Sequence, residues 1–309
     1  MSVLIVGSIA YDSVASPEGS VERALGGSAT YGGLSCRFLQ QHMTGQETGL
    51  VGVVGNDFAD EDRKILADAG LDLEGLETAD GETFRWEGAY HGAMAEAETK
   101  ATYLNVFEHF QPSVPGTWQE PNVVFCANLH PALQNSVLEQ TTAGRMTMLD
   151  SMNLWITIAK PALLEVMQAV DLIIINDGEA RMLSGDENLV RAMHALAQET
   201  NTHTLIVKRG EHGVLALHEG VLLALPAVPT ADVVDPTGCG DSFAGTLIAY
   251  LVGRQGVLTD IEAIRNALVH ATVTSSFTLG GLGISGISSI DRGIYHARVD
   301  RYRRIAGIK

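Results

Sequence analysis

The chain has 309 residues and a mass of 32.9 kDa, which is enough for one large α/β domain or two smaller ones with a substantial core. Its formal net charge of −17 argues against a protein that binds nucleic acid, because such proteins depend on clustered Lys and Arg side chains. Three widely spaced cysteines, Cys36, Cys126 and Cys239, predict neither a disulfide framework nor a metal knuckle, and we expect a cytoplasmic protein.

The chain opens on an apolar run, residues 3–6, that predicts a strand buried on both faces of a parallel sheet. The run is too short to span a membrane and lacks the basic region of a signal peptide, so we expect no membrane association. Asp12 follows at the carboxyl end of this strand, where open α/β sheets bind ligands. Asp12 is therefore either a turn residue or an acceptor for substrate hydroxyls.

A diglycine, Gly26 and Gly27, stands before a helical stretch that runs to about residue 41. Glycines at a helix entry let a substrate lie close to the backbone, but an ordinary flexible turn explains them equally well. Residues 50–54 predict another strand, and a helix follows at about residues 59–69 with Asp57 as its cap.

Residues 83–90 and 101–107 alternate in the manner of strands. Together with the chain around residues 11–25, they predict a small lid sheet beside the ligand-binding end of the main sheet. An exposed hydrophobic face on this lid would instead be a dimer surface.

The middle of the chain alternates strands with helices, which implies a parallel sheet with right-handed crossovers. The predicted strands are residues 122–127, 145–149, 171–175 and 204–207, with helices from about residues 132, 160 and 187 between them. Asn153 follows one strand end, where a structural turn and a substrate contact are both reasonable interpretations.

Asn176 and Glu179 stand three residues apart just after a predicted strand, so they share one face of a helix's first turn. Taken alone, the pair reads as a capping box. The next strand ends in a loop with Lys208 and Gly210 that suits contact with a nucleotide, where Lys208 could neutralise phosphate charge. A solvated basic turn before a hairpin is the alternative.

Residues 233–245 predict an extended segment, a tight loop and the start of a helix. The amides of Gly238, Cys239 and Gly240 would converge on an anion, because a helix start leaves N–H groups without internal partners. Asp241 would repel that anion unless its task is to accept a proton from a hydroxyl that attacks phosphorus. The alternative is that Asp241 only caps the helix.

Residues 235–241 (DPTGCGD) and 243–245 (FAG) resemble the C-terminal signature of the PfkB (ribokinase-like) family of carbohydrate and nucleoside kinases. The resemblance covers nearly all of the chain and implies a three-layer α/β/α fold with a mainly parallel central sheet and a small β lid. It implies a single kinase domain over residues 1–309, with lid segments at about 11–25 and 83–107. It also implies ATP and Mg²⁺ as cofactors, and it raises the question of a monovalent cation such as K⁺ near Asp235.

The resemblance assigns roles to individual residues. Asp241 is implied to be the catalytic base, with the amides of Gly238, Cys239 and Gly240 as the anion hole. The residues implied to bind the acceptor substrate are Asp12, Gly26, Gly27, Tyr31 and Asn153. The residues implied to bind ATP are Asn176, Glu179, Lys208, Gly210 and Thr237, with Glu179 organising Mg²⁺ through water.

The sequence departs from the family pattern at three places. Tyr31 stands where Asn is common, which makes a simple ribose or fructose less certain as the substrate. Lys208 stands where a hydroxyl residue is common, and the Arg usual after Asn153 is missing.

Three functions compete. The main prediction is a kinase for a small sugar or polyol, able to pair as a homodimer through the lid. A nucleoside kinase is the second, because Tyr31 could stack on a base, and a catalytically silent ligand-binding member is the third. The GxGxxG match at residues 281–286 follows a predicted helix with too little chain after it for a βαβ unit, so we reject a Rossmann site.

Overall fold

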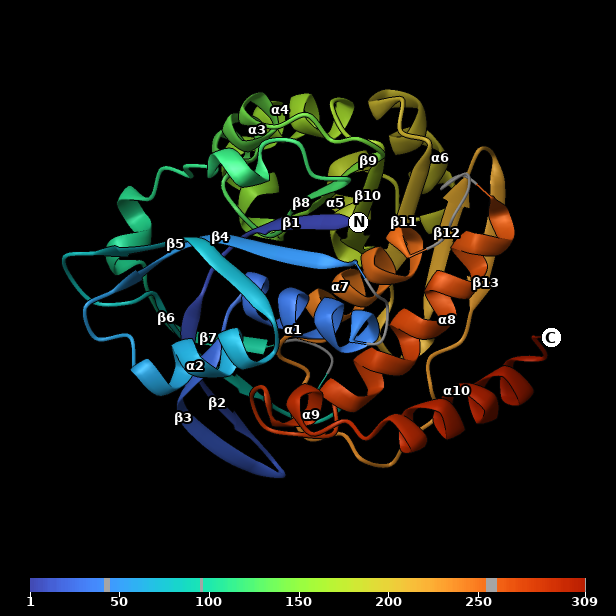
Figure 1. Cartoon of the computed structure of the whole chain (residues 1–309). Helices are drawn as coiled ribbons and strands as arrows, with labels where there is room; N and C mark the ends of the chain where they lie inside the picture. The colour runs from blue at the N-terminus through green and yellow to red at the C-terminus, as the bar shows by residue number, and fades with distance from the viewer. Residues whose placement is uncertain (42–44, 95–96, 254–259, 309) are drawn as a thin grey trace.

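The computed structural model describes residues 1–41, 45–94, 97–253 and 260–308. A nine-stranded sheet crosses the molecule, with helices on both of its faces (Figure 1). In spatial order its strands are β13 (Val221–Leu225), β12 (Val214–His218), β11 (Thr204–Lys208), β10 (Leu172–Asn176), β9 (Met146–Asp150), β8 (Val123–Cys126), β1 (Ser2–Val6), β4 (Glu47–Gly55) and β5 (Leu71–Ala79). Pairing is parallel from β11 to β5, and β12 and β13 add an antiparallel hairpin.

The helices form the two outer layers, so the predicted three-layer α/β/α fold with a mainly parallel sheet is confirmed. One face carries α1 (Ser28–Gln40), α2 (Asp60–Asp68), α7 (Cys239–Val252), α8 (Ile261–Thr278) and α10 (Arg292–Ala306), with the short α9 (Ser285–Ser288) packed beside them. The other carries α3 (Pro131–Gln140), α4 (Asn153–Gln168), α5 (Asp177–Ser184) and α6 (Leu189–Thr200). No helix in the described ranges is both long and apolar enough to cross a bilayer.

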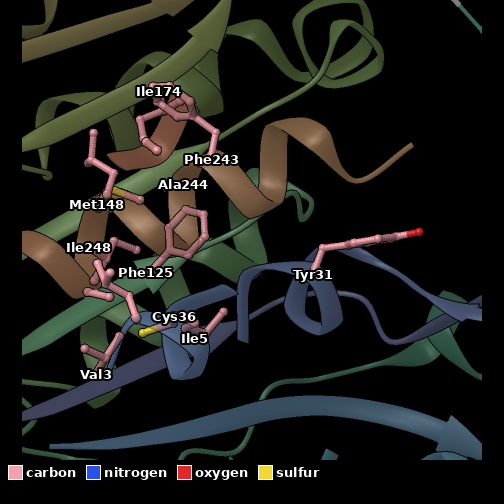
Figure 2. Close-up of a cluster of buried hydrophobic side chains, with 14 of the residues drawn as sticks. Val3, Ile5, Tyr31, Cys36, Phe125, Met148, Ile174, Phe243, Ala244 and Ile248 are labelled. Carbon is pink, nitrogen blue, oxygen red and sulfur yellow. The ribbon is translucent and has the colours of Figure 1, made fainter. Parts of the chain in front are cut away.

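Successive side chains of a strand point to opposite faces of the sheet, so the central strands contribute to the hydrophobic cores on both faces. On β1, Val3 and Ile5 pack toward α1 and α7, whereas Leu4 and Val6 pack toward the opposite layer. Figure 2 shows the first of these clusters, where strand residues meet side chains of α7 such as Phe243. Burial of both faces explains why these strands are apolar throughout.

A second sheet of four strands, in the order β3-β2-β6-β7, forms the lid. Its strands are β2 (Ala10–Ser16), β3 (Gly19–Gly26), β6 (Arg85–Tyr90) and β7 (Ala97–Tyr103); β2 and β6 are parallel, and the other pairs are antiparallel. Val14, Tyr90 and Met94 form a small apolar cluster against Val233, so the lid contacts the segment that leads into α7.

Two sheet predictions were wrong in detail. The strand expected at residues 101–107 is β7 at Ala97–Tyr103, and a 3₁₀ helix follows at Asn105–His109. Strand β5 was not predicted, because it is an edge strand whose sequence, LDLEGLETA, alternates acids with apolar residues instead of forming an apolar run.

Two local predictions on helices were also wrong. Helix α4 begins at Asn153 and not near residue 160; its backbone breaks at Ala159, two residues before Pro161, which cannot donate a backbone hydrogen bond. Asp57 does not cap α2, whose N-cap is Ala59; its carboxylate instead accepts hydrogen bonds from the amide and hydroxyl of Thr83, both at 2.7 Å.

Candidate active site

Several parallel strands end beside the first turn of α7. Asp150 is the last residue of β9, Asn176 of β10 and Lys208 of β11. Strand β1 leads to Ser8, whose carbonyl accepts a hydrogen bond from the amide of Ala29 in α1 at 2.9 Å. Polar groups from distant parts of the chain therefore converge at one edge of the sheet, as expected for an open α/β fold.

Helices α1 and α7 cross at close range because two glycines face each other. A Cβ on Gly245 would lie only 2.7 Å from the carbonyl carbon of Gly32, so a larger residue would force the helices apart. This crossing aligns the first turns of α1 and α7. It places Tyr31 of α1 against Gly238, the N-cap of α7.

The three amides predicted to form an anion hole differ in their hydrogen bonding. The first backbone hydrogen bond of α7 runs from the Ser242 amide to the Gly238 carbonyl at 2.8 Å. The Gly240 amide lies two residues earlier, in the first turn, and therefore has no acceptor within the helix. The amide of Cys239 differs from the prediction, because it donates to the Pro236 carbonyl at 3.1 Å. In this structure, therefore, Gly238 and Gly240 are better placed than Cys239 to donate to an anion.

Asp241 lies in the first turn of α7 and is partly exposed. Burial and the nearby charge of Asp150 raise the pKa of Asp241 to about 6, against the opposing effect of Lys208. The positive end of a helix favours the ionised carboxylate and by itself would lower the pKa of Asp241. Burial acts in the opposite direction, and a pKa near neutrality suits a general base.

Asp12 fits against the predicted diglycine. Its side chain is 5% exposed, and the amide of Gly27 donates a hydrogen bond to its carboxylate. A Cβ on Gly26 would lie 2.6 Å from the carboxyl carbon of Asp12, and Gly27 has a φ of +93°, so both glycines serve this contact. Burial, then the charges of Asp241 and Asp235, raise the pKa of Asp12 to about 7.

Tyr31 is 1% exposed, and its hydroxyl has no hydrogen-bond partner among the described residues. Burial and the charges of Asp12, Asp235 and Asp241 hold its pKa well above the usual range. Its ring turns away from the other labelled side chains of the core (Figure 2) and lies against Gly238. A buried ring offers no open face, so the predicted stacking on a base does not fit this structure.

Lys208, which is partly exposed, forms an ion pair with the buried Asp150, with 2.7 Å between Nζ and Oδ2. Burial alone would lower the pKa of Lys208, but the carboxylates of Asp150 and Glu179 raise it. The Lys208 ammonium would lie 3.0 Å from a Cβ on Gly240. A fixed positive charge thus sits beside the start of α7, as expected for a group that receives phosphate.

Asn176 and Glu179 form the capping box that their spacing predicts. The carboxylate of Glu179 accepts hydrogen bonds from the amide and side chain of Asn176, both at 2.7 Å, and the Glu179 amide donates back to Asn176 at 2.8 Å. Burial and the charge of Asp150 raise the pKa of Glu179 to about 7. Cap and metal site are compatible, because each carboxylate oxygen keeps a further lone pair.

The lid reaches the loop before α7 through a residue that the sequence did not single out. The hydroxyl of Tyr90 on β6 lies 3.2 Å from the hydroxyl of Thr237. Asp235 is fully buried and accepts hydrogen bonds from the amides of Thr237 and Gly283, at 2.9 and 3.0 Å. The GxGxxG segment thus supports this loop, which agrees with rejecting it as a dinucleotide site.

Two predicted residues lie apart from these contacts. Asn153 is the exposed first residue of α4, and Gly210 is exposed in a short 3₁₀ turn after β11. Their proposed contacts with substrate and ATP stay predictions. The sequence analysis did not include Asp150 among the site residues, although an acid at the end of a buried strand was a usable signal. Nothing in the sequence pointed to Tyr90, because its partner Thr237 is 147 residues away.

A sequence model described as pfkB family carbohydrate kinase matches residues 1–279. A cytidine kinase from Thermococcus kodakarensis is 26% identical over 260 residues, covering 82% of this chain and 90% of its own. A 2-dehydro-3-deoxygalactonokinase from Haloferax volcanii is 29% identical over 165 residues, about half of each chain. The structure of a ribokinase II-like protein from Escherichia coli with ATP and Mg²⁺ superposes with a TM-score of 0.76 at 18% identity, covering 97% of this chain and 99% of that one.

Proposed function

The chain belongs to the pfkB family of carbohydrate kinases, and we propose that its site transfers the γ-phosphoryl group of ATP to a hydroxyl of a small sugar or polyol. The main support is that Asp241 stands in the first turn of α7, beside the Gly240 amide and within electrostatic reach of Asp12 and Lys208. A base, an anion site and an acceptor for substrate hydroxyls thus share one edge of the sheet.

In the proposed reaction, Asp241 accepts the proton of the substrate hydroxyl as its oxygen bonds to the γ-phosphorus. The bond from that phosphorus to the oxygen it shares with ADP breaks. The amides of Gly238 and Gly240, joined by Cys239 if its bond to Pro236 opens, stabilise the negative charge on the phosphoryl oxygens. Lys208 adds a positive charge beside them.

For ATP and Mg²⁺ we propose the ligands that the sequence suggested. Asn176, Lys208, Gly210 and Thr237 would contact ATP, and Glu179 would hold Mg²⁺ through water. No group of three or more metal-ligating side chains occurs in the described part of the chain. Such a sparse site suits Mg²⁺, which keeps several waters and binds few carboxylates. When bound, Mg²⁺ would neutralise phosphate charge, and the buried carboxyls of Glu179 and Asp150 would gain a counter-charge.

We also propose that a monovalent cation such as K⁺ supports activity near Asp235. The side chain of Asp235 is fully buried, and the backbone amides of Thr237 and Gly283, which donate hydrogen bonds to its carboxylate, are neutral. A nearby cation would compensate this buried charge. Activity in K⁺ should exceed activity in tetramethylammonium at equal ionic strength, and equal rates would contradict this part of the proposal.

We propose that residues 1–309 act as one kinase domain in the cytoplasm, with lid segments near 11–25 and 83–107. Free thiols at Cys36, Cys126 and Cys239 suit that compartment.

We also propose that two copies pair through the lid, with edge strand β7 as the contact. Strand β7 is mostly exposed but carries charged residues, which discourage edge pairing. Light scattering would test it.

A nucleoside kinase is the second candidate, and the observation in its favour is the similarity to a cytidine kinase over most of both chains. A catalytically silent member is the third. ADP release should be measured with ribose, fructose, inositol, adenosine and cytidine. A sugar or polyol as best acceptor supports the proposal, a nucleoside favours the second candidate, and no turnover with any alcohol favours the third.

A further inference from the structure

The large sheet ends on one side in strand β13, whose outer edge pairs with no other strand in the described ranges (Figure 1). The sequence of this strand, VLLAL, contains no charged residue. Val221 and Leu222 are 51% and 41% exposed, and Ala224 is exposed as well. A neutral, apolar edge strand is an open template for pairing with another strand, and natural proteins usually protect such edges with charged side chains.

The other sheet edges in the described part of the chain carry this protection. Edge strand β5 contains three acidic residues, and the lid edges β3 and β7 each contain one acid and one base. These residues are Asp72, Glu74 and Glu77 on β5, Glu22 and Arg23 on β3, and Glu98 and Lys100 on β7. Strand β13 is therefore the edge where an incoming strand would meet no charge.

The hairpin turn between β12 and β13 fixes the direction of the backbone groups. His218 and Val221 face each other across a two-residue turn, Glu219 and Gly220. The φ angles of these turn residues are +47° and +82°. Positive φ at both positions is typical of a type I′ hairpin turn, in which the closing pair of residues is hydrogen-bonded. His218 and Val221 are thus a hydrogen-bonded pair.

Hydrogen-bonded and non-bonded pairs alternate along an antiparallel ladder, so the rest of β13 follows from its first residue. Val221, Leu223 and Leu225 direct their N–H and C=O groups to β12. Leu222 and Ala224 direct theirs away from the sheet. No turn, loop or cap hydrogen bond in the described ranges uses these outward groups.

The side chains of the same two residues extend past the helix layer. Ala224 and Leu222 stand opposite Leu215 and Leu217 of β12, so these four side chains share one face of the sheet. Leu215 and Leu217 are buried in the core beneath α4, α5 and α6. Leu222 and Ala224, one strand further out, are exposed. A further strand beside β13 would cover both their backbone groups and their side chains.

We infer that this further strand is β13 of a second copy of the chain, antiparallel and related by a two-fold axis at Leu223. In that register Leu222 faces the partner's Ala224, and Ala224 faces the partner's Leu222. Each facing pair can exchange two backbone hydrogen bonds, because all of these groups point outward. One strand therefore supplies both halves of a self-complementary contact, as a two-fold interface requires.

The register also avoids charge repulsion along the strand. Val221 faces the partner's Leu225, and Glu219, in the turn, comes opposite the partner's Ala227. No acidic side chain of the hairpin therefore stands directly across from another acid. The contact lies on a different sheet from the lid, and it does not depend on the proposed kinase function.

The overall charge opposes this dimer and predicts its salt dependence. Each copy has a formal net charge of −17, so two copies repel each other unless salt screens the charge. We expect Kd to fall by about tenfold between about 0.05 M and 0.5 M KCl. A short strand edge covers less area than a standard interface, so Kd should lie in the range of about 1–100 µM at the higher salt concentration.

Sedimentation velocity of the full chain in about 0.5 M KCl, from about 1 to 200 µM, tests the association. We expect the mass to rise with concentration from 32.9 kDa to twice that value. Hydrogen exchange at the Leu222 and Ala224 amides should slow over the same range, because the dimer protects these amides. A monomer at every concentration, or a dimer whose Leu222 and Ala224 amides exchange freely, overturns the inference.

Charged substitutions test the register. Leu222→Lys and Ala224→Glu should each raise Kd by at least about 100-fold, because each brings a charge against an apolar partner residue. With both substitutions on one chain, opposite charges face each other twice across the axis, and Kd should return to within about tenfold of the wild type. A double variant that associates no better than the single variants overturns the inference.

Two controls accompany these variants. The Tm, kcat and KM of Leu222→Lys should match the wild-type values, because its side chain is exposed and lies outside the site. Thr102→Lys places the same charge on an exposed position of the lid edge β7 and should leave the β13 contact intact. If Thr102→Lys produces monomers and Leu222→Lys does not, the lid forms the interface and the inference is wrong.

Discussion

The ring of Tyr31 lies against the backbone of Gly238, where a Cβ would come within 2.5 Å of ring atom Cδ2. Gly238 also has a φ of +75°, which side-chain-bearing residues rarely adopt. Gly238→Ala should therefore destabilise the protein by about 2–4 kcal/mol, because it combines a clash with backbone strain. Urea unfolding would measure the loss.

A second variant, Tyr31→Ala, separates the clash from the backbone strain. Truncation of the buried ring is itself destabilising, but it should cost less in a Gly238→Ala background than in the wild type, since there it also removes the clash and leaves only the strain. Strictly additive effects of the two substitutions would mean that the ring and Gly238 do not constrain each other. Gly220→Ala is a suitable control for strain alone, because Gly220 has a φ of +82° and no atom within 4 Å of its Cβ position.

Asp241→Asn should lower kcat by about 10²–10⁴-fold, because the amide cannot accept the proton of the substrate hydroxyl. The Kd for ATP should stay within about threefold, or tighten slightly as a negative charge near the phosphates is lost. Rapid-mix kinetics and ATP titration would check both values. Equal, modest losses in kcat and in ATP affinity would argue against Asp241 as the base.

The sequence predicted the loop before α7 and the start of that helix well, because the residues that specify them are neighbours in the chain. Glycines, an acid and an apolar helical pattern between residues 233 and 245 specify a loop and a helix start regardless of the rest of the chain. The buried strands could be predicted equally well, since apolar runs such as residues 3–6 and 172–175 are short and have clear ends.

What the sequence could not predict depends on contacts between distant segments. The pKa of Asp241 is set by its burial and by Asp150, which lies 91 positions earlier in the chain. The ring of Tyr31 is buried because α1 crosses α7 at Gly32 and Gly245. Neither relationship leaves a local pattern, and both change how the site works.

Acid should raise stability while it lowers activity. The pKa values of Asp12, Glu179 and Asp241 in the folded protein, about 7, 7 and 6, exceed the usual 3.8–4.5 of these groups. Between pH 4 and 7 the folded state therefore binds more protons than the unfolded state, and the free energy of unfolding falls as pH rises through this window. We expect a gain of at least about 1 kcal/mol on moving from pH 8 to pH 5.5.

Activity should follow the opposite course, because Asp241 must be ionised to accept a proton. Below about pH 6, kcat should fall by up to tenfold per pH unit. Asp12→Asn is the control for stability: it removes one raised carboxyl, so it should be more stable than the wild type at pH 8 and show a flatter pH profile. A wild-type stability that rises from pH 5.5 to pH 8 would contradict the assignment.

The Lys208–Asp150 ion pair should be costly to break from one side. Lys208→Met leaves Asp150, whose side chain is 5% exposed, without its partner, and we expect a loss of about 3–5 kcal/mol. Lys64→Met is the matched control, because the Lys64–Asp68 pair is largely exposed and should lose less than about 0.5 kcal/mol. Similar losses in the two variants would mean that the buried pair is screened as a surface pair is.

The contact between Tyr90 and Thr237 joins the lid to the loop that precedes α7. If this contact holds the lid over the acceptor, Tyr90→Phe and Thr237→Val should each raise the acceptor KM by about three- to tenfold, since one neutral hydrogen bond contributes about 1 kcal/mol. The acceptor KM of the double variant should not exceed that of the more impaired single variant, because both substitutions remove the same hydrogen bond. Multiplied effects in the double variant would instead place the two hydroxyls in separate roles, with Thr237 acting on ATP and Tyr90 on the acceptor.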